Sequence, residues 1–176
     1  MPNTALIIVD MQVGLLEDDN YPIFNKGQLI SNFNELISKA RNTGTTVIFV
    51  RHTEGFGSPL EIHQPGWQIS PEIQMTDNDI VIDKYAPDCF HKTPLIEVLQ
   101  SKNITKLEIA GLQSEYCIDT TCRRSFTLGY DTVLISDGHS TCNSPILSAD
   151  KIILHHNQVL SSVFVTLQDH SNTDFH

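Results

Sequence analysis

Six short runs rich in β-branched residues recur along the chain, and their alternation with helical or loop segments is what most constrains the fold. The runs cover residues 5–10, 45–51, 79–83, 106–110, 131–136 and 162–166. Continuous apolar strands that alternate with helices form parallel sheets that are covered on both faces. We therefore predict an α/β fold of three layers, in which helices flank a six-stranded parallel sheet.

Helical patterns fill several of the connecting segments. Apolar residues recur at helical spacing from 29 to 40, and further helices are predicted at 93–99, 117–129 and 148–159. Gly44 stands where the first of these helices would have its C-terminal cap. The segment 52–76 holds three Gly, three Pro and the only Trp, so we predict a long ordered loop there. Loops of that length in compact domains usually carry function.

Composition narrows the class of protein. The 176 residues, 40% of them hydrophobic, suit one domain over residues 1–176. The net charge of −10 and the lack of a basic run argue against nucleic acid and anionic membranes as main partners, so we expect a small molecule or a protein. The first apolar run is too short for a secretion signal or a membrane span, and we expect a cytoplasmic protein.

The four cysteines are dispersed at 89, 117, 122 and 142, with no pair at CxxC spacing. We therefore predict free thiols, with neither a disulfide framework nor a structural zinc site.

Three residues suited to catalysis fall at predicted strand ends. Asp10 ends the first strand, Lys84 follows the third, and Cys117 lies six residues after Gly111, which follows the fourth. Ligands of an open parallel sheet bind at the carboxyl ends of its strands. A cysteine nucleophile needs a proton acceptor and a nearby cation, which Asp10 and Lys84 would supply. At the start of a helix, unpaired N–H groups would also lower the pKa of the Cys117 thiol.

Each of these residues has a simpler interpretation as well. An aspartate at a strand end often caps a turn, a lysine such as Lys84 can pair with Asp83 in solvent, and a free cysteine is commonly a small buried apolar residue. We expect that last role for the other three cysteines. The shared placement of Asp10, Lys84 and Cys117 on one edge of one sheet favours the catalytic interpretation.

Three ordered segments of the chain resemble the signature segments of the isochorismatase-like cysteine hydrolases. They are residues 5–12, 81–84 and 109–122, and the resemblance continues through 129–141. It implies strand order 3-2-1-4-5-6, a homo-oligomer, and a catalytic triad of Asp10, Lys84 and Cys117. It also implies a cis peptide bond between Leu112 and Gln113, after which the backbone amides of Gln113 and Cys117 form an oxyanion hole.

The activity that the resemblance implies is hydrolysis of a small amide or related C–N acyl compound, without a cofactor. Asp10 would take the thiol proton, Lys84 would stabilise the anionic forms, and Cys117 would carry the acyl group. Two alternatives are a vinyl-ether hydrolase of the isochorismatase type, which needs no cysteine at this position, and a thiol redox sensor or binding protein.

Other residues are candidates for the substrate pocket. We predict that the substrate contacts Gln113, Leu112, Trp67, Phe56 and Tyr116. Glu115 could contact the substrate or only favour a helix N-terminus, and His139 could reach the crevice or only shape a turn.

We predict no metal ion. Nicotinamidases of the resembling family carry an Asp-x-His metal motif just after the second strand, and residues 51–54, Arg-His-Thr-Glu, lack it. A rearranged metal site of His52, Glu54 and His63 is the alternative, because imidazole and carboxylate are suitable ligands.

Overall fold

One six-stranded sheet forms the centre of the computed structural model, which describes residues 3–175. Its strand order is β3-β2-β1-β4-β5-β6, and all five ladders between neighbouring strands are parallel. This confirms the predicted fold class and strand order. The strands are β1 (Thr4–Val9), β2 (Thr46–His52), β3 (Ile80–Lys84), β4 (Lys106–Leu112), β5 (Asp131–Ser140) and β6 (Thr166–Gln168).

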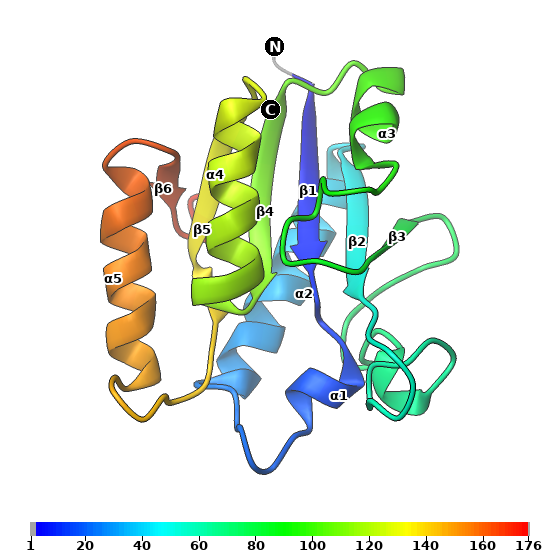
Figure 1. Cartoon of the computed structure of the whole chain (residues 1–176). Coiled ribbons are helices and arrows are strands. Elements are labelled where there is room, and N and C mark those ends of the chain that lie inside the picture. Colours follow the sequence, from blue (N-terminus) through cyan, green and yellow to red (C-terminus); the bar gives the residue numbers. More distant parts are fainter. Residues whose placement is uncertain (1–2, 176) are drawn as a thin grey trace.

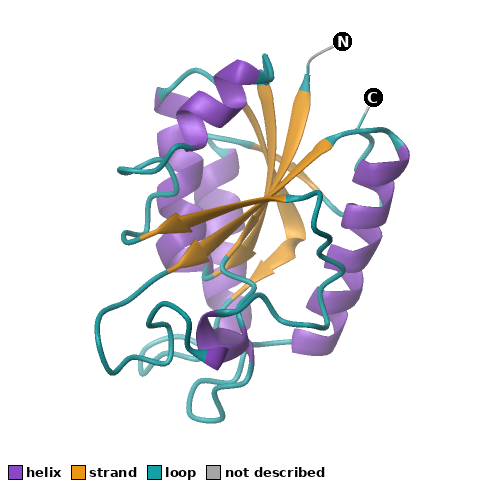
Figure 2. Cartoon of the chain, turned by 90° about the vertical axis from the view of Figure 1, so that its right-hand side faces the viewer, coloured by secondary structure: helices purple, strands orange, loops and turns teal. Residues whose placement is uncertain are grey.

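Helices cover both faces of this sheet (Figures 1 and 2). Helix α2 (Lys26–Asn42) lies on one face, and α3 (Leu95–Ser101), α4 (Asp119–Thr127) and α5 (Ala149–Ser161) lie on the other. The short helix α1 (Val13–Leu16) lies beyond the carboxyl ends of the strands, at the bottom of Figure 1. No helix within residues 3–175 is both long enough and apolar enough to cross a membrane.

Successive side chains of β1 point into two different cores. Leu6 and Ile8 pack with Phe33 of α2, whereas Ile7 and Val9 pack on the opposite face with α3 and α4. Burial on both faces explains why the strand is a continuous apolar run instead of an alternating one.

The last strand differs from the prediction. The predicted strand 162–166 shares only Thr166 with β6, so the prediction was wrong for residues 162–165. The reason is that α5 continues to Ser161 and the carbonyl of Leu160 accepts hydrogen bonds from the amides of Phe164 (2.8 Å) and Val165 (3.1 Å). The backbone turns there, and the strand begins after the turn.

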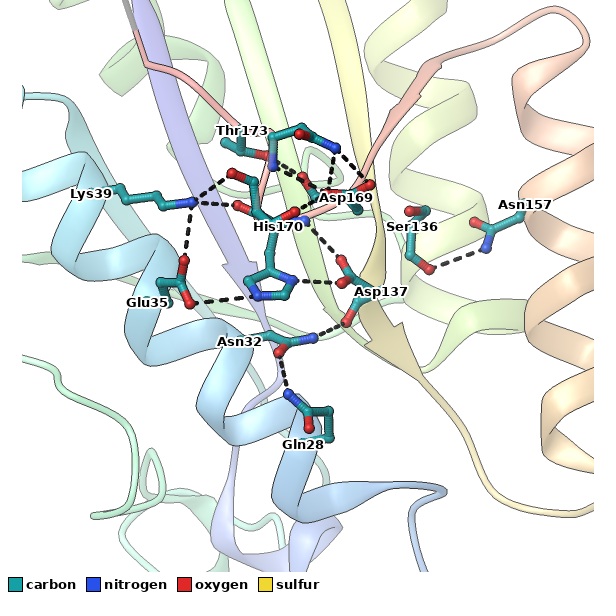
Figure 3. Close-up of polar contacts among 12 residues, drawn as sticks. Gln28, Asn32, Glu35, Lys39, Ser136, Asp137, Asn157, Asp169, His170 and Thr173 are labelled. Carbon is teal, nitrogen blue, oxygen red and sulfur yellow. Dashed lines mark hydrogen bonds and ion pairs between the residues drawn. The ribbon is translucent and has the colours of Figure 1, made fainter.

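Polar contacts hold the segment after β6 against α2 and β5 (Figure 3). Lys39 Nζ donates to the carbonyls of His170 (2.8 Å) and Ser171 (3.0 Å). The His170 ring lies between two carboxylates, 2.5 Å from Asp137 and 3.5 Å from Glu35. These contacts secure the edge of the sheet where β6 is only a short strand.

Gly111 of β4 lies too close to β1 to carry a side chain. Its φ of 142° is rarely adopted by other residues, and a Cβ atom there would lie 2.1 Å from the carbonyl oxygen of Val9. The register of β4 against β5 shifts between Ile109 and Gly111. The glycine thus lets β4 pass β1 closely just before the chain turns toward Cys117.

We expect Gly111→Ala to lower the free energy of unfolding by about 3 kcal/mol or more, because both the conformation and the contact with Val9 oppose a methyl group. Gly27→Ala in α2 is the matched control: nothing lies within 4 Å of its Cβ position, and the change should stabilise the helix by about 0.5 kcal/mol. Urea denaturation of both variants checks this, and an unchanged midpoint for Gly111→Ala would contradict it.

Candidate active site

The carboxyl ends of β1, β3 and β4 bring Asp10, Lys84 and Cys117 together. Lys84 Nζ lies 2.8 Å from Asp10 Oδ2 and donates a hydrogen bond to Cys117 Sγ at 3.1 Å. Asp10 and Lys84 are buried, and Cys117 is 9% exposed. The structure therefore juxtaposes the three residues that the sequence placed on one edge of the sheet.

Asp10 leaves β1 in a left-handed conformation, with a φ of 56° that aspartate tolerates better than most residues. Its backbone amide donates to the carbonyl of Val50 at 2.8 Å, which ties the end of β1 to β2. Carboxylate oxygen Oδ1 is buried and has no hydrogen-bond partner among residues 3–175. One acceptor oxygen is thus free beside the thiol and the ammonium group.

Lys84 has a third contact, because its ammonium group lies 3.2 Å from Nδ1 of His52. Burial is the largest single influence on Lys84 and lowers its pKa, but the Asp10 carboxylate and the sulfurs of Cys89 and Cys117 together raise it more. The net pKa is therefore raised, and the ammonium stays charged. Burial and the neighbouring Lys84 charge lower the pKa of His52. His52 is therefore neutral near pH 7, and its Nδ1 accepts a hydrogen bond from the ammonium group.

Cys117 lies in a π-helical turn, Ser114–Ile118, that precedes α4. The carbonyl of Gln113 accepts hydrogen bonds from the amides of Tyr116 (3.1 Å) and Ile118 (3.2 Å), and the latter closes the wide turn. The peptide bond between Leu112 and Gln113 is cis. The expectation that a regular helix begins at Cys117 is therefore corrected.

The pKa of the Cys117 thiol is raised, which also corrects the expectation of a lowered value. Burial is the largest cause, and the Asp10 carboxylate adds to it, while the Lys84 charge acts in the opposite direction without prevailing. The resting sulfur is protonated at neutral pH. The thiol must lose its proton before the sulfur can act as a nucleophile, and the Asp10 carboxylate interacts directly with this thiol.

His139 supports the turn that carries Cys117. Its Nε2 donates to Oδ1 of Asn157 in α5 (2.8 Å), so its Nδ1 accepts from the hydroxyl of Ser114 (2.8 Å). Burial lowers the pKa of His139 to about 4, and the ring is neutral. Residues 137–140 belong to β5, so the turn expected around His139 is not formed, and its ring instead links α5 to the turn that carries Cys117.

A cavity of about 220 Å³ opens above Cys117, and we call it the Cys117 cavity. Two of the predicted substrate contacts, Gln113 and Tyr116, line it. The complete lining is Asp10, Leu15, His52, Glu54, Leu60, Pro87, Gln113, Tyr116 and Cys117.

The other three predicted substrate contacts lie elsewhere. Leu112 is fully buried in β4, and Phe56 is 98% exposed at a loop tip. Trp67 is buried, with its indole N–H donating to Thr53 Oγ1 at 2.8 Å and Arg51 stacked on its ring. None of the three lines the Cys117 cavity. The loop after β2 shapes the cavity through Glu54 and Leu60 instead.

Reasoning from sequence misses Gln12, which ties the site together. Its buried side-chain amide donates to the carbonyls of His52 and Trp67, both at 2.9 Å, and its Oε1 accepts from the His52 amide at 2.7 Å. One side chain thus joins the end of β1 to β2 and to the following loop. Its signal in the sequence is its place as the last residue of the first signature segment, residues 5–12.

The alternative metal ligands do not form one cluster. His52 Nε2 lies 3.7 Å from Glu54 Oε1, but the His63 ring packs edge-on against Trp67 with a centroid distance of 5.7 Å. Within residues 3–175, no three His, Cys, Asp or Glu side chains are grouped so that they could hold a metal ion.

Fold and site together define an α/β protein with a buried Asp-Lys-Cys cluster at the carboxyl edge of its sheet. Residues 4–150 match the isochorismatase domain, and the chain therefore belongs to the isochorismatase family. The Bacillus subtilis family member YrdC is 35% identical over 136 residues, which cover 76% of this chain and 71% of YrdC. A crystal structure of an isochorismatase family protein superposes with a TM-score of 0.90 at 30% identity, covering 96% of this chain and 99% of that one.

Two relatives have names that state a reaction. Streptothricin hydrolase of Streptomyces noursei is 28% identical over 82% of this chain and 57% of its own length. Ureidoacrylate amidohydrolase RutB of Cronobacter sakazakii is 27% identical over 81% of this chain and 76% of its own. The chain is thus a family hydrolase, and the comparisons leave its substrate open.

We expect stability to fall as the pH drops from about 6.5 to about 4, because the unfolded chain protonates His139 in this range while the native ring stays neutral. Protonation of this residue in the unfolded chain lowers the free energy of unfolding by up to about 3 kcal/mol. Denaturation measured at pH 7 and at pH 4.5 should show that the free energy of unfolding falls less between these two pH values in His139→Gln than in the wild type. Replacing the exposed His155 is the control, and equal losses in the wild type and His139→Gln would contradict the assignment.

We expect Asp10→Asn to lower the pKa of the Cys117 thiol, because the carboxylate charge raises it. Alkylation of Cys117 by iodoacetamide at pH 7.5 should then be at least about fivefold faster than in the wild type. Peptide mass spectrometry follows the rate, with Cys142 in the same digest as the internal reference. A rate that is unchanged or slower would count against Asp10 as the cause of the raised pKa.

Proposed function

We propose that the chain is a cysteine hydrolase that acts on a small amide or related C–N acyl compound through a covalent acyl-enzyme on Cys117. The observation that carries the proposal is the buried Lys84 ammonium group, which contacts both the Asp10 carboxylate and the Cys117 sulfur beside a cavity. The amidohydrolase and hydrolase among the relatives support the reaction class.

In the first step the sulfur attacks the carbonyl carbon while its proton passes to Asp10. Oδ1 of Asp10 is the acceptor, since Oδ2 is engaged by Lys84. Because the thiol is protonated at rest, proton transfer and attack occur together instead of through a stable thiolate. Lys84 keeps its charge and stabilises the developing anion on sulfur. His52, held neutral, accepts a hydrogen bond from the ammonium group and keeps Lys84 directed at the site.

In the second step the tetrahedral intermediate collapses. Its oxyanion binds the backbone amides of Gln113 and Cys117, as the family resemblance implies. Asp10, now protonated, gives its proton to the leaving nitrogen, so an amine or ammonia departs and a thioester remains. Water then attacks the thioester with Asp10 as the base, the acid is released, and the proton returns to sulfur.

The wider expectations remain proposals of the same kind. We propose that the protein works without a metal or other cofactor, as a single domain and as a homo-oligomer in the cytoplasm. A small molecule, and neither nucleic acid nor a membrane, is its proposed main partner, in keeping with the net charge of −10.

We expect Cys117→Ala and Cys117→Ser to lower amide turnover by at least about 10³-fold, because no acyl-enzyme can form by this route. Intact mass spectrometry of the wild type with small primary amides, carbamoyl compounds and nicotinamide should reveal an acyl adduct on Cys117. Cys122→Ala, which removes a buried thiol of α4, is the control and should keep the adduct. Turnover that survives Cys117→Ala would reject this mechanism and favour the vinyl-ether type of hydrolysis.

A further inference from the structure

A second cavity of about 360 Å³ adjoins the Cys117 cavity, and we call it the Glu115 cavity. The two share Leu15, Gln113 and Tyr116 as walls, so a ligand whose carbonyl lies over Cys117 can extend into the second space. The remaining walls of the Glu115 cavity are Gly14, Asp18, Tyr21, Glu115, Cys142, Asn143, Ser144 and Pro145.

The ionised groups on these walls are all carboxylates. Asp18 and Glu115 line the Glu115 cavity, and Asp10 and Glu54 line the Cys117 cavity. Among the described residues, no lysine or arginine lines either space, and Lys84 is fully buried against Asp10. A ligand carboxylate would meet like charge here and would find no cation to pair with.

Neither carboxylate of the Glu115 cavity forms an ion pair with another side chain among the described residues. Oε1 of Glu115 accepts a hydrogen bond from Thr141 (2.9 Å), while its Oε2 is buried without a partner within residues 3–175. Oδ1 of Asp18 accepts from the backbone and side chain of Asn20, at 2.9 and 3.1 Å. Of these atoms, Oε2 of Glu115 is withdrawn from water, which costs free energy that a bound cation nearby would offset.

Two aromatic rings stand on the same walls. Tyr21 is 61% exposed and Tyr116 is 57% exposed, although large aromatic side chains more commonly bury most of their surface. The faces of aromatic rings attract organic cations in addition to the attraction from carboxylates. Rings and uncompensated carboxylates around one space match an organic ammonium or guanidinium group better than a neutral or anionic group.

We infer that the substrate carries a protonated amine or guanidine, which occupies the Glu115 cavity while the carbonyl to be cleaved lies over Cys117. This inference rests on the proposed hydrolysis, and it names the class of compound on which that hydrolysis acts.

Three primary amides of similar length test the inference: 5-aminopentanamide, hexanamide and glutaramate, which are cationic, neutral and anionic. We expect kcat/KM to be about tenfold higher for the cationic amide than for the neutral one, and lowest for the anionic one. Glu115→Gln and Asp18→Asn should each lower the ratio of cationic to neutral kcat/KM severalfold. This ratio does not depend on how much of a variant folds correctly.

Asp19→Asn is the matched control, because it removes the same charge from the residue next to Asp18. The side chain of Asp19 is exposed and lines neither cavity. It should leave the ratio unchanged. A ratio of one in the wild type, or a preference for glutaramate, would overturn the inference while hydrolysis at Cys117 stood.

Calorimetric binding of the same three amides to Cys117→Ala separates the two proposals. If no amide is hydrolysed by the wild type but 5-aminopentanamide binds Cys117→Ala more tightly than hexanamide, the proposed function fails and the cation site is supported. Equal affinities for all three amides would overturn the cation site.

Discussion

The buried ammonium group of Lys84 is the constraint on which the site depends. A fully buried amine without partners would lose its proton, because removing a charge from water is costly. Asp10, Cys117 and His52 supply one contact each, and they come from the ends of different strands and the turn after β4. The ends of β1, β2, β3 and β4 must therefore keep their relative positions for Lys84 to stay charged.

Much of the fold and the core of the site could be predicted, because both depend on local pattern. Strands buried on both faces are continuous apolar runs, and in a parallel sheet their carboxyl ends share one edge. That rule predicts that Asp10, Lys84 and Cys117 lie near one another, and the family resemblance implies their roles. The extent of the last strand did not follow, since the carbonyl of Leu160 ends α5 with hydrogen bonds that no residue pattern announces.

The remaining features of the site depend on contacts between distant segments. The turn at Cys117 is supported by His139 from β5, and the raised pKa of Cys117 comes from burial beside Asp10. Trp67 and Phe56 belong to one loop, yet Trp67 is buried, with its indole N–H donating to Thr53, and Phe56 is exposed. The sequence predicts that these residues lie in a loop, but it does not predict which of their side chains are buried.

The raised pKa of Cys117 has a consequence for the durability of the protein. Peroxides oxidise thiolates and not thiols, so a sulfur that keeps its proton until substrate arrives is a poor target for conversion to sulfenic acid. An enzyme of this design would keep its nucleophile reduced in an oxidising environment without a partner cysteine to rescue it. In the proposed mechanism, the burial that keeps the Cys117 thiol protonated would therefore also protect this sulfur from oxidation.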